Sequence, residues 1–249
     1  MIKLKESLEN ISLRIKVAAE RAGRNADDIK IVAVTKQVGF ETIKILSDLN
    51  WKDIGENRVA DAVEKSTVLS GNLFTWHMIG HLQTNKVKKA VALFEYIHSL
   101  NNLHLAEIIR KEAEKAGKLI KVLIQVNVSG ETTKQGINPG ELADFYKEVR
   151  KFTIRNFQSV QSNEADECRK GGIKVVGLMT MAPLTDNPEK TRPYFRRLRG
   201  LLDDLKSNFT DIDGSNDLKY LSMGMSQDFE IAVEEGANLL RIGSAIFDS

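Results

Sequence analysis

Short apolar runs alternate with amphipathic segments along nearly the whole chain. Residues 31–35 are apolar and mostly β-branched, and they follow a polar stretch, which predicts a buried strand. Residues 2 to about 22 carry apolar side chains at three- and four-residue spacing, which predicts an amphipathic helix. Because the alternation continues toward the last residues, the pattern predicts a parallel sheet with helices between its strands.

The pattern predicts eight strands with helical patterns in the seven intervals between them. The strands cover residues 31–35, 51–55, 74–80, 96–99, 122–128, 174–179, 220–223 and 239–242. Eight such units favour an α/β fold of the closed (β/α)8 TIM-barrel type, built as a single domain over residues 1–249. The last residues leave no room for a helix after the eighth strand, and the N-terminal helix would cover that gap. An open doubly wound sheet is the alternative, but no Gly-x-Gly-x-x-Gly motif follows the first strand.

Local signals add expectations for the second half of the chain. Ser226 is a candidate N-cap for the helix after the seventh strand. We expect residues 158–172 to form a polar surface excursion and residues 211–217 to form a turn. The helix that starts near Pro188 should bury a stripe made of Tyr194, Leu198, Leu201 and Leu205.

Composition narrows the function classes. The chain has 36 basic and 34 acidic residues, a formal net charge of +2 and 42% hydrophobic residues. These balanced charges give no electrostatic reason to expect nucleic acid or an anionic membrane as a partner. Cys168 is the one cysteine, which excludes an internal disulfide and a cysteine-based metal cluster, and we expect no metal site. A charged N-terminus without an apolar core and the lack of a long apolar run lead us to expect a cytoplasmic protein.

Lys36 stands at the end of the first predicted strand, where parallel barrels place their active sites. Partial burial of its amine in a pocket would make the amine a nucleophile toward carbonyl carbons. Lysines at strand ends are more often simply solvated, so this position alone does not decide between the two interpretations.

Barrels often bind phosphate at the loops after the seventh and eighth strands. Met225 and Ser226 lie in the first of these loops, where backbone N–H groups and a hydroxyl suit an anion. Gly243 and Ser244 lie in the second, and glycine lets the backbone approach a phosphate closely. Each loop alone is better explained by a helix cap or a turn, but their joint position favours a phosphate site.

The eighth strand neighbours the first in a closed barrel, so Lys36 and both loops would face one mouth. A lysine beside a phosphate site predicts a phosphorylated carbonyl compound, with pyridoxal 5'-phosphate (PLP) as the leading candidate. Arg241 would contact the edge of the bound ring, and its guanidinium would keep a pyridine nitrogen unprotonated. The cofactor would then be a poorer electron sink than beside a carboxylate. The alternative for Arg241 is a surface salt bridge.

Six segments, spread in order over nearly the whole chain, resemble the pyridoxal phosphate homeostasis proteins, which are related to the N-terminal barrel of alanine racemase. The segments cover residues 33–36, 55–57, 77–86, 177–181, 221–228 and 241–247. The resemblance implies a barrel with Lys36 as the Schiff-base lysine and Arg241 at the pyridine nitrogen. It further implies phosphate contacts from Ser226, Gly243 and Ser244.

The same resemblance extends the expected cofactor site to five more residues. They are Asn57, His81, Met179, Ser222 and Met225. Asn57 and Met179 would line the pocket. The alternative role for His81 is structural, because a histidine after a strand is more often a hydrogen-bonding loop residue.

Two considerations favour a carrier over a catalyst. The family is regarded as having no established reaction and is linked to supplying and buffering PLP and to amino-acid balance. A racemase needs acid–base groups on both faces of the substrate carbon, which alanine racemases complete with a second domain and a partner subunit. We therefore expect a monomeric, non-catalytic PLP-binding protein with PLP-requiring apo-enzymes as recipients. An amino-acid racemase is one alternative, and a metabolic barrel that binds sugar phosphates without an imine is the other.

Overall fold

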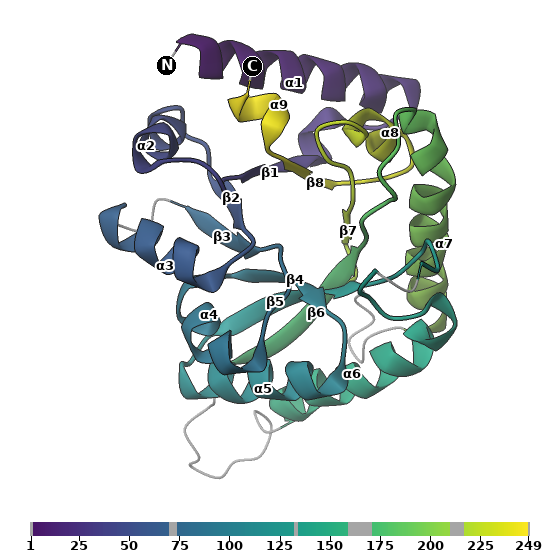
Figure 1. Ribbon diagram of the computed structural model, residues 1–249. Helices are drawn as coiled ribbons and strands as arrows, with labels where there is room; N and C mark the ends of the chain where they lie inside the picture. The colour runs from purple at the N-terminus through teal and green to yellow at the C-terminus, as the bar shows by residue number, and fades with distance from the viewer. Residues whose placement is uncertain (1, 70–73, 132–133, 159–170, 210–216, 249) are drawn as a thin grey trace.

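Eight parallel strands form a closed barrel in sequence order, β1 to β8 (Figure 1). The computed structural model describes residues 2–69, 74–131, 134–158, 171–209 and 217–248, and the side chains of 153–158 are left aside. The first strand pairs with the last in parallel, with Val32 aligned to Arg241. The predicted barrel is confirmed, and its closure brings the two ends of the chain together.

Helices follow the strands and surround the barrel. The strands are β1 (Lys30–Val34), β2 (Asp53–Glu56), β3 (Thr75–Met78), β4 (Tyr96–Leu100), β5 (Leu119–Gln125), β6 (Gly172–Met179), β7 (Tyr220–Ser222) and β8 (Leu239–Ile242). The α-helices are α1 (Ile2–Arg21), α2 (Phe40–Asp48), α3 (Val59–Val68), α4 (Val87–Leu93), α5 (Leu103–Lys115), α6 (Leu142–Gln158), α7 (Arg192–Asn208), α8 (Phe229–Glu234) and α9 (Ser244–Phe247). Four short 3₁₀ segments complete the described chain: η1 (Ala26–Asp28), η2 (Thr84–Lys86), η3 (Pro139–Glu141) and η4 (Pro188–Thr191).

The prediction for the fifth strand was wrong in its boundaries. β5 covers Leu119–Gln125, so each of its ends lies three residues before the corresponding end of the predicted range, 122–128. Val126 and Val128 are buried although they follow the strand, and Val126 makes only an isolated bridge to Ile137. The apolar pattern reports burial, and here burial continues into the loop. The expectation of no helix after the eighth strand was also wrong, since α9 follows β8.

The buried stripe of α7 differs from the predicted one. The structure buries Phe195, Leu198, Leu202 and Leu205, whereas Tyr194 and Leu201 are half-buried. At two of the four positions, the buried residue is therefore the one that follows the predicted residue. The predicted excursion at 158–172 includes the last residue of α6 and the first residue of β6. Its other residues lie almost entirely outside the described residues, as does most of the predicted turn at 211–217.

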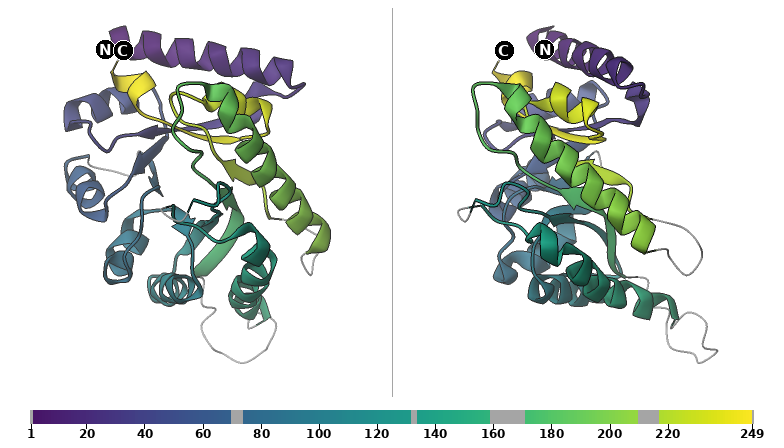
Figure 2. Two further views of the ribbon diagram at one scale, coloured as in Figure 1. Left: turned by 45° about the vertical axis from the view of Figure 1, so that its right-hand side comes forward. Right: turned by 90° about the vertical axis from the view of Figure 1, so that its right-hand side faces the viewer.

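The N-terminal helix α1 covers the barrel beside its closing strands, as predicted. Its apolar face buries Leu8, Ile11 and Ile15, and the helix lies against α8 and α9 (Figure 2). Each fully buried aliphatic side chain of this kind contributes about 1.5–3 kcal/mol to the stability of the fold. This packing holds α9, and with it the loop after β8, in place.

The apolar residues divide into two groups. The larger group fills the space between the strands and the helices. A smaller group consists of strand residues that point into the barrel: Val32, Tyr96, Leu123, Val176, Met179 and Leu239.

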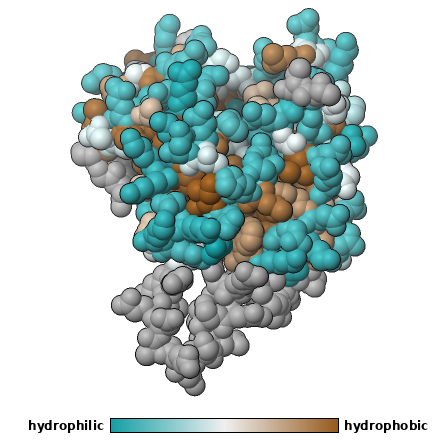
Figure 3. Space-filling model, turned by 60° about the horizontal axis from the view of Figure 1, so that its bottom comes forward, coloured by the Kyte–Doolittle hydropathy of each residue, from teal (hydrophilic) through white to brown (hydrophobic). Residues whose placement is uncertain are grey.

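The face in Figure 3 is mostly hydrophilic, with smaller hydrophobic groups between the polar side chains. Among the described helices, none is long and apolar enough to cross a membrane.

Candidate cofactor site

A cleft of about 670 Å³ opens at the C-terminal ends of the strands. Eight of the ten predicted site residues line it: Lys36, Asn57, His81, Met225, Ser226, Arg241, Gly243 and Ser244. Ser222 and Met179 do not line the cleft, and both are fully buried in strands. The structure therefore brings most of the predicted site together and places two of its residues beneath the cleft.

Lys36 lies just beyond β1, and its side chain is exposed at the cleft instead of partly buried. The backbone beside it is held by a buried cluster. Lys65 Nζ donates to the carbonyl oxygen of Thr35 and to Glu56 Oε1, both at 2.6 Å. The Thr35 hydroxyl donates to the same Glu56 oxygen at 2.6 Å. An ion pair from α3 and β2 thus anchors the strand end that presents the Lys36 amine.

Asn57 follows β2 directly and is exposed at the cleft. Its backbone lies against Gly80 in the loop after β3. A Cβ atom on Gly80 would lie 2.3 Å from the Asn57 carbonyl oxygen, so only glycine allows this approach. His81 follows this glycine, lines the cleft and is exposed.

The loops after β7 and β8 are joined across the cleft. The Ser226 hydroxyl accepts a hydrogen bond from the backbone N–H of Ala245 at 3.1 Å. The prediction that Ser226 caps the next helix was therefore wrong, since α8 begins after Asp228. Asp228 Oδ1 accepts from the backbone N–H of Met225 at 2.6 Å and closes the loop. Ser226 is thereby placed beside Ser244 at the start of α9 rather than over α8.

Gly224 is required where this loop leaves β7. Its φ angle is +91°, and a Cβ atom there would lie 2.6 Å from the Cβ of Ala232. A side chain at this position would both strain the backbone and collide with α8. This glycine therefore sets the direction in which Met225 and Ser226 enter the cleft.

Arg241 is buried, so the alternative of a surface salt bridge is excluded. Its Nη1 donates to Ser222 Oγ at 2.6 Å and its Nη2 donates to the carbonyl oxygen of Thr180 at 2.9 Å. Burial lowers the pKa of Arg241 to about 10, with the charge of Asp228 opposing the change. The guanidinium therefore stays cationic at neutral pH and can only donate hydrogen bonds.

The sequence interpretation included Ser222 and Arg241 but missed two histidines inside the barrel. His77 and His98 are fully buried side chains in β3 and β4, and each has polar partners on other strands. Histidines in short apolar strands were the available signal, because such residues need partners when buried. Lys65 was missed because a lysine in an amphipathic helix normally faces solvent. In the part of the chain that the structure describes, no cluster of three metal-ligating side chains occurs.

Comparisons with known proteins show what the chain is similar to. The family model of the alanine racemase N-terminal domain matches residues 7–249. A pyridoxal phosphate homeostasis protein of Aquifex aeolicus is 41% identical over 242 residues, which cover 97% of this chain and 96% of the relative. The protein of the same name from Pseudomonas aeruginosa is 30% identical over 247 residues, covering 99% of this chain and 96% of that one.

Solved structures extend the comparison to three dimensions. PipY of Synechococcus elongatus PCC7942, solved with PLP bound, is 28% identical with a TM-score of 0.70, and the match covers 95% of this chain and 99% of PipY. An alanine racemase of Clostridium difficile matches with a TM-score of 0.70 at 17% identity, covering 99% of this chain and 56% of the racemase. At that identity the racemase shows the fold alone.

Proposed function

We propose that this chain, which belongs to the pyridoxal phosphate homeostasis proteins within the alanine racemase N-terminal domain family, binds PLP in the cleft and buffers and supplies it inside the cell. The observation that carries the proposal is the composition of the cleft. A lysine amine, a buried donor-only guanidinium and two joined hydroxyl-bearing loops face the same space. These are the groups that an aldehyde, a ring nitrogen and a phosphate require.

The donor set fits the phosphate end of PLP. Ser226 and Ser244 supply hydroxyl groups, and Gly243 supplies backbone without a side chain in the way. The hydrogen bond from the backbone N–H of Ala245 to the Ser226 hydroxyl joins the two loops. We assign the phosphate contacts to Ser226, Gly243 and Ser244, with Met225, Asn57 and His81 as further lining residues.

PLP supplies an aldehyde that a lysine amine binds covalently and reversibly, with release of water. Lys36 is the lysine that we assign to this role, because its side chain is exposed at the cleft and its strand end is anchored. An exposed amine is accessible to an incoming cofactor and to the water that releases it. That accessibility suits a carrier.

Arg241 would face the ring nitrogen of the cofactor. Because a guanidinium only donates, a nitrogen facing it accepts a hydrogen bond and carries no proton. This arrangement withdraws fewer electrons from the ring than a carboxylate partner would allow, so the bound cofactor would be the poorer electron sink. Ser222 holds the guanidinium from below, and Met179 belongs to the apolar barrel interior beneath the site.

The racemase alternative has less support, and a transfer assay separates it from the carrier. The full-length protein is loaded with PLP, desalted and mixed with an apo-enzyme whose activity requires PLP. We expect the loaded protein to restore that activity while it racemises no amino acid from a panel of L-amino acids. Racemisation that disappears in Lys36→Ala would instead establish the enzyme. Binding of sugar phosphates without retained PLP would establish the metabolic barrel.

We further propose that the protein acts as a monomer in the cytoplasm, with PLP-requiring apo-enzymes as its recipients. The monomer is consistent with a cleft whose lining residues include the proposed lysine, arginine and phosphate-binding loops. Light scattering of the PLP-loaded protein at micromolar concentration tests it. A mass of 27.9 kDa is expected, and twice that mass would refute the monomer.

A further inference from the structure

Five side chains form a continuous chain of hydrogen bonds through the inside of the barrel. Asp53 Oδ1 lies 2.9 Å from His77 Nε2, and His77 Nδ1 lies 3.0 Å from His98 Nε2. His98 Nδ1 lies 2.9 Å from Ser222 Oγ, which accepts from Arg241 Nη1 at 2.6 Å. We call these five residues the interior relay. It connects the cleft with the start of β2, at the opposite end of the barrel.

The interior relay is closed to water along most of its length. His77, His98 and Ser222 are fully buried and Arg241 is 4% exposed. Asp53, with 20% of its side chain exposed, is the most exposed member, and Arg241 lies at the cleft. Buried polar groups of this kind need every hydrogen bond satisfied, so their proton positions are strongly constrained.

With both imidazoles neutral, the carboxylate end of the interior relay determines the direction of its bonds. A carboxylate only accepts, so His77 must donate to Asp53 from Nε2 and accept at Nδ1. His98 must then donate from Nε2 and accept at Nδ1. The Ser222 hydroxyl donates to that Nδ1 and accepts from Arg241, whose guanidinium only donates. The Arg241 end is compatible with this direction, because the Ser222 oxygen can accept from the guanidinium while its hydroxyl donates to His98. Each neutral imidazole then carries its proton on Nε2.

The surroundings of both histidines disfavour their charged forms. Burial lowers the pKa of His77, and Lys30 and Lys121 lower it further against the opposing effect of Asp53. Burial also lowers the pKa of His98 well below its usual range, and the charge of Arg241 adds to this. The His77 ring is held by stacking on Tyr96, with ring centroids 4.5 Å apart.

We infer that the interior relay is a positioning device that holds the guanidinium of Arg241 in one orientation at the floor of the cleft, deepening the proposed function on which it rests. A second interpretation would be a proton path to the cleft. The direction of the bonds argues against it, because a guanidinium that stays charged releases no proton into the relay. The relay therefore presents Arg241 to the ring nitrogen and does not exchange protons with it.

The first test reads the proton positions in the full-length protein without added PLP. Long-range ¹H–¹⁵N correlation spectra of the histidine side chains report which ring nitrogen carries the proton. We expect His77 and His98 to be neutral with the proton on Nε2 at neutral pH, while the exposed His81 and His104 provide reference spectra. A cationic ring, or a proton on Nδ1 of either residue, would overturn the inferred direction.

The second test cuts the relay beside Arg241. Ser222→Ala removes the hydroxyl that joins His98 to the guanidinium, and Ser99→Ala is the matched control. Ser99 is a buried serine that follows His98 in β4. Its hydroxyl has no hydrogen-bond partner among the described residues.

We expect Ser222→Ala to raise the dissociation constant of PLP about tenfold, as expected for one lost hydrogen bond to a charged group. It should also shift the absorption maximum of the bound cofactor, and Ser99→Ala should change neither. An unshifted spectrum and an unchanged dissociation constant in Ser222→Ala would refute the positioning role. Failure of PLP to bind to Lys36 in the unaltered protein would instead refute the proposed function, and the proton positions would remain an independent result.

Discussion

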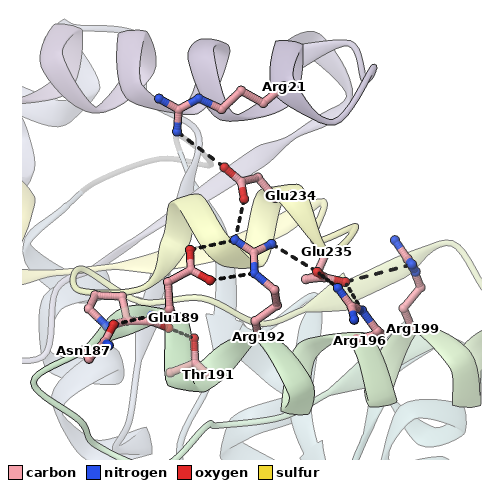
Figure 4. Close-up of polar contacts among 10 residues, drawn as sticks. Arg21, Asn187, Glu189, Thr191, Arg192, Arg196, Arg199, Glu234 and Glu235 are labelled. Atoms are coloured by element: carbon pink, nitrogen blue, oxygen red, sulfur yellow. Dashed lines mark hydrogen bonds and ion pairs between the residues drawn. The ribbon is translucent and has the colours of Figure 1, made fainter.

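Two groups of ionic side chains in this molecule differ in how they are supported. Inside the barrel wall, Lys65 pairs with Glu56, and their side chains are 10% and 0% exposed. On the outside, Arg192 binds three carboxylates at once, those of Glu189, Glu234 and Glu235, as Figure 4 shows. We call Glu189, Arg192, Arg196, Glu234 and Glu235 the outer network.

The difference lies in what replaces a lost partner. Each member of the outer network that is removed leaves neighbours with other partners or with water, because Arg196 is 63% and Glu189 58% exposed. Among the described residues the buried pair has no alternative charged partner, and it has little contact with water, so removal of one charge leaves the other uncompensated. The buried pair therefore determines the position of the strand end at Lys36, whereas the outer network fastens η4 and α7 to α8 redundantly.

Lys65→Met removes one charge of the buried ion pair and should have the largest effect on stability. It leaves the Glu56 carboxylate buried without its counter-charge and should lower the free energy of unfolding by about 3–5 kcal/mol. Urea unfolding measures the change. Adding Glu56→Gln should restore part of the loss, because the uncompensated charge is then removed. A loss under about 1 kcal/mol in Lys65→Met would contradict the comparison.

The pH dependence of stability tests the interior relay. The pKa values of His77 and His98 are lowered in the folded protein, chiefly by burial, so at acidic pH the unfolded chain binds more protons than the folded one. Stability should therefore fall as the pH drops below about 6.5, the ordinary value for histidine. Urea unfolding from pH 7.5 to 5 should show a flatter profile in His98→Gln than in the exposed control His104→Gln. Identical profiles would show that the buried histidines do not carry the effect.

Glu235→Gln tests the better buried part of the outer network. Burial favours a raised pKa for Glu235, but hydrogen bonds from Arg196 and Arg192 outweigh it, and the pKa is lowered. Losing this charge should lower the free energy of unfolding by about 1 kcal/mol, because Arg192 keeps its other carboxylates. Urea unfolding at pH 7 measures it. A loss as large as that of Lys65→Met would show that the outer network is not redundant.

The smallest effect is expected at the edge of the outer network. Arg21 lies 3.5 Å from Glu234 and is 67% exposed. Arg21→Ala should change the free energy of unfolding by less than about 0.5 kcal/mol, and 1 M NaCl should remove even that. A larger, salt-resistant change in the urea midpoint would mean that α1 depends on this contact.

The barrel and the position of the cleft could be predicted from the sequence because they depend on local signals. Apolar runs mark strands whatever their partners are, and the loops after strands seven and eight could be located by counting. Gly243 and Ser244 line the cleft for this reason, and their contacts to phosphate stay a prediction. The helix after β8 was missed, since four residues are too few to show a period.

The contacts of the polar interior could not be predicted, because they join residues far apart in the chain. His98 and Ser222 are 124 positions apart, and nothing local to either indicates the other. Lys65 also binds the carbonyl oxygen of Thr35, 30 positions away, and nothing local to either residue indicates that contact. The pattern of hydrophobic positions reports which side chains are buried, but the fold decides which polar atoms meet.

The central claim is that Lys36 holds the cofactor, and one measurement tests it most directly. The full-length protein is incubated with PLP, reduced with borohydride, digested and mapped by mass spectrometry, with Lys36→Arg as the matched control. We predict one modification of the mass of reduced PLP on the peptide that contains Lys36, absent from the control. Modification scattered over surface lysines, or equal labelling of the control, would contradict the claim and leave only a barrel with a phosphate-binding cleft.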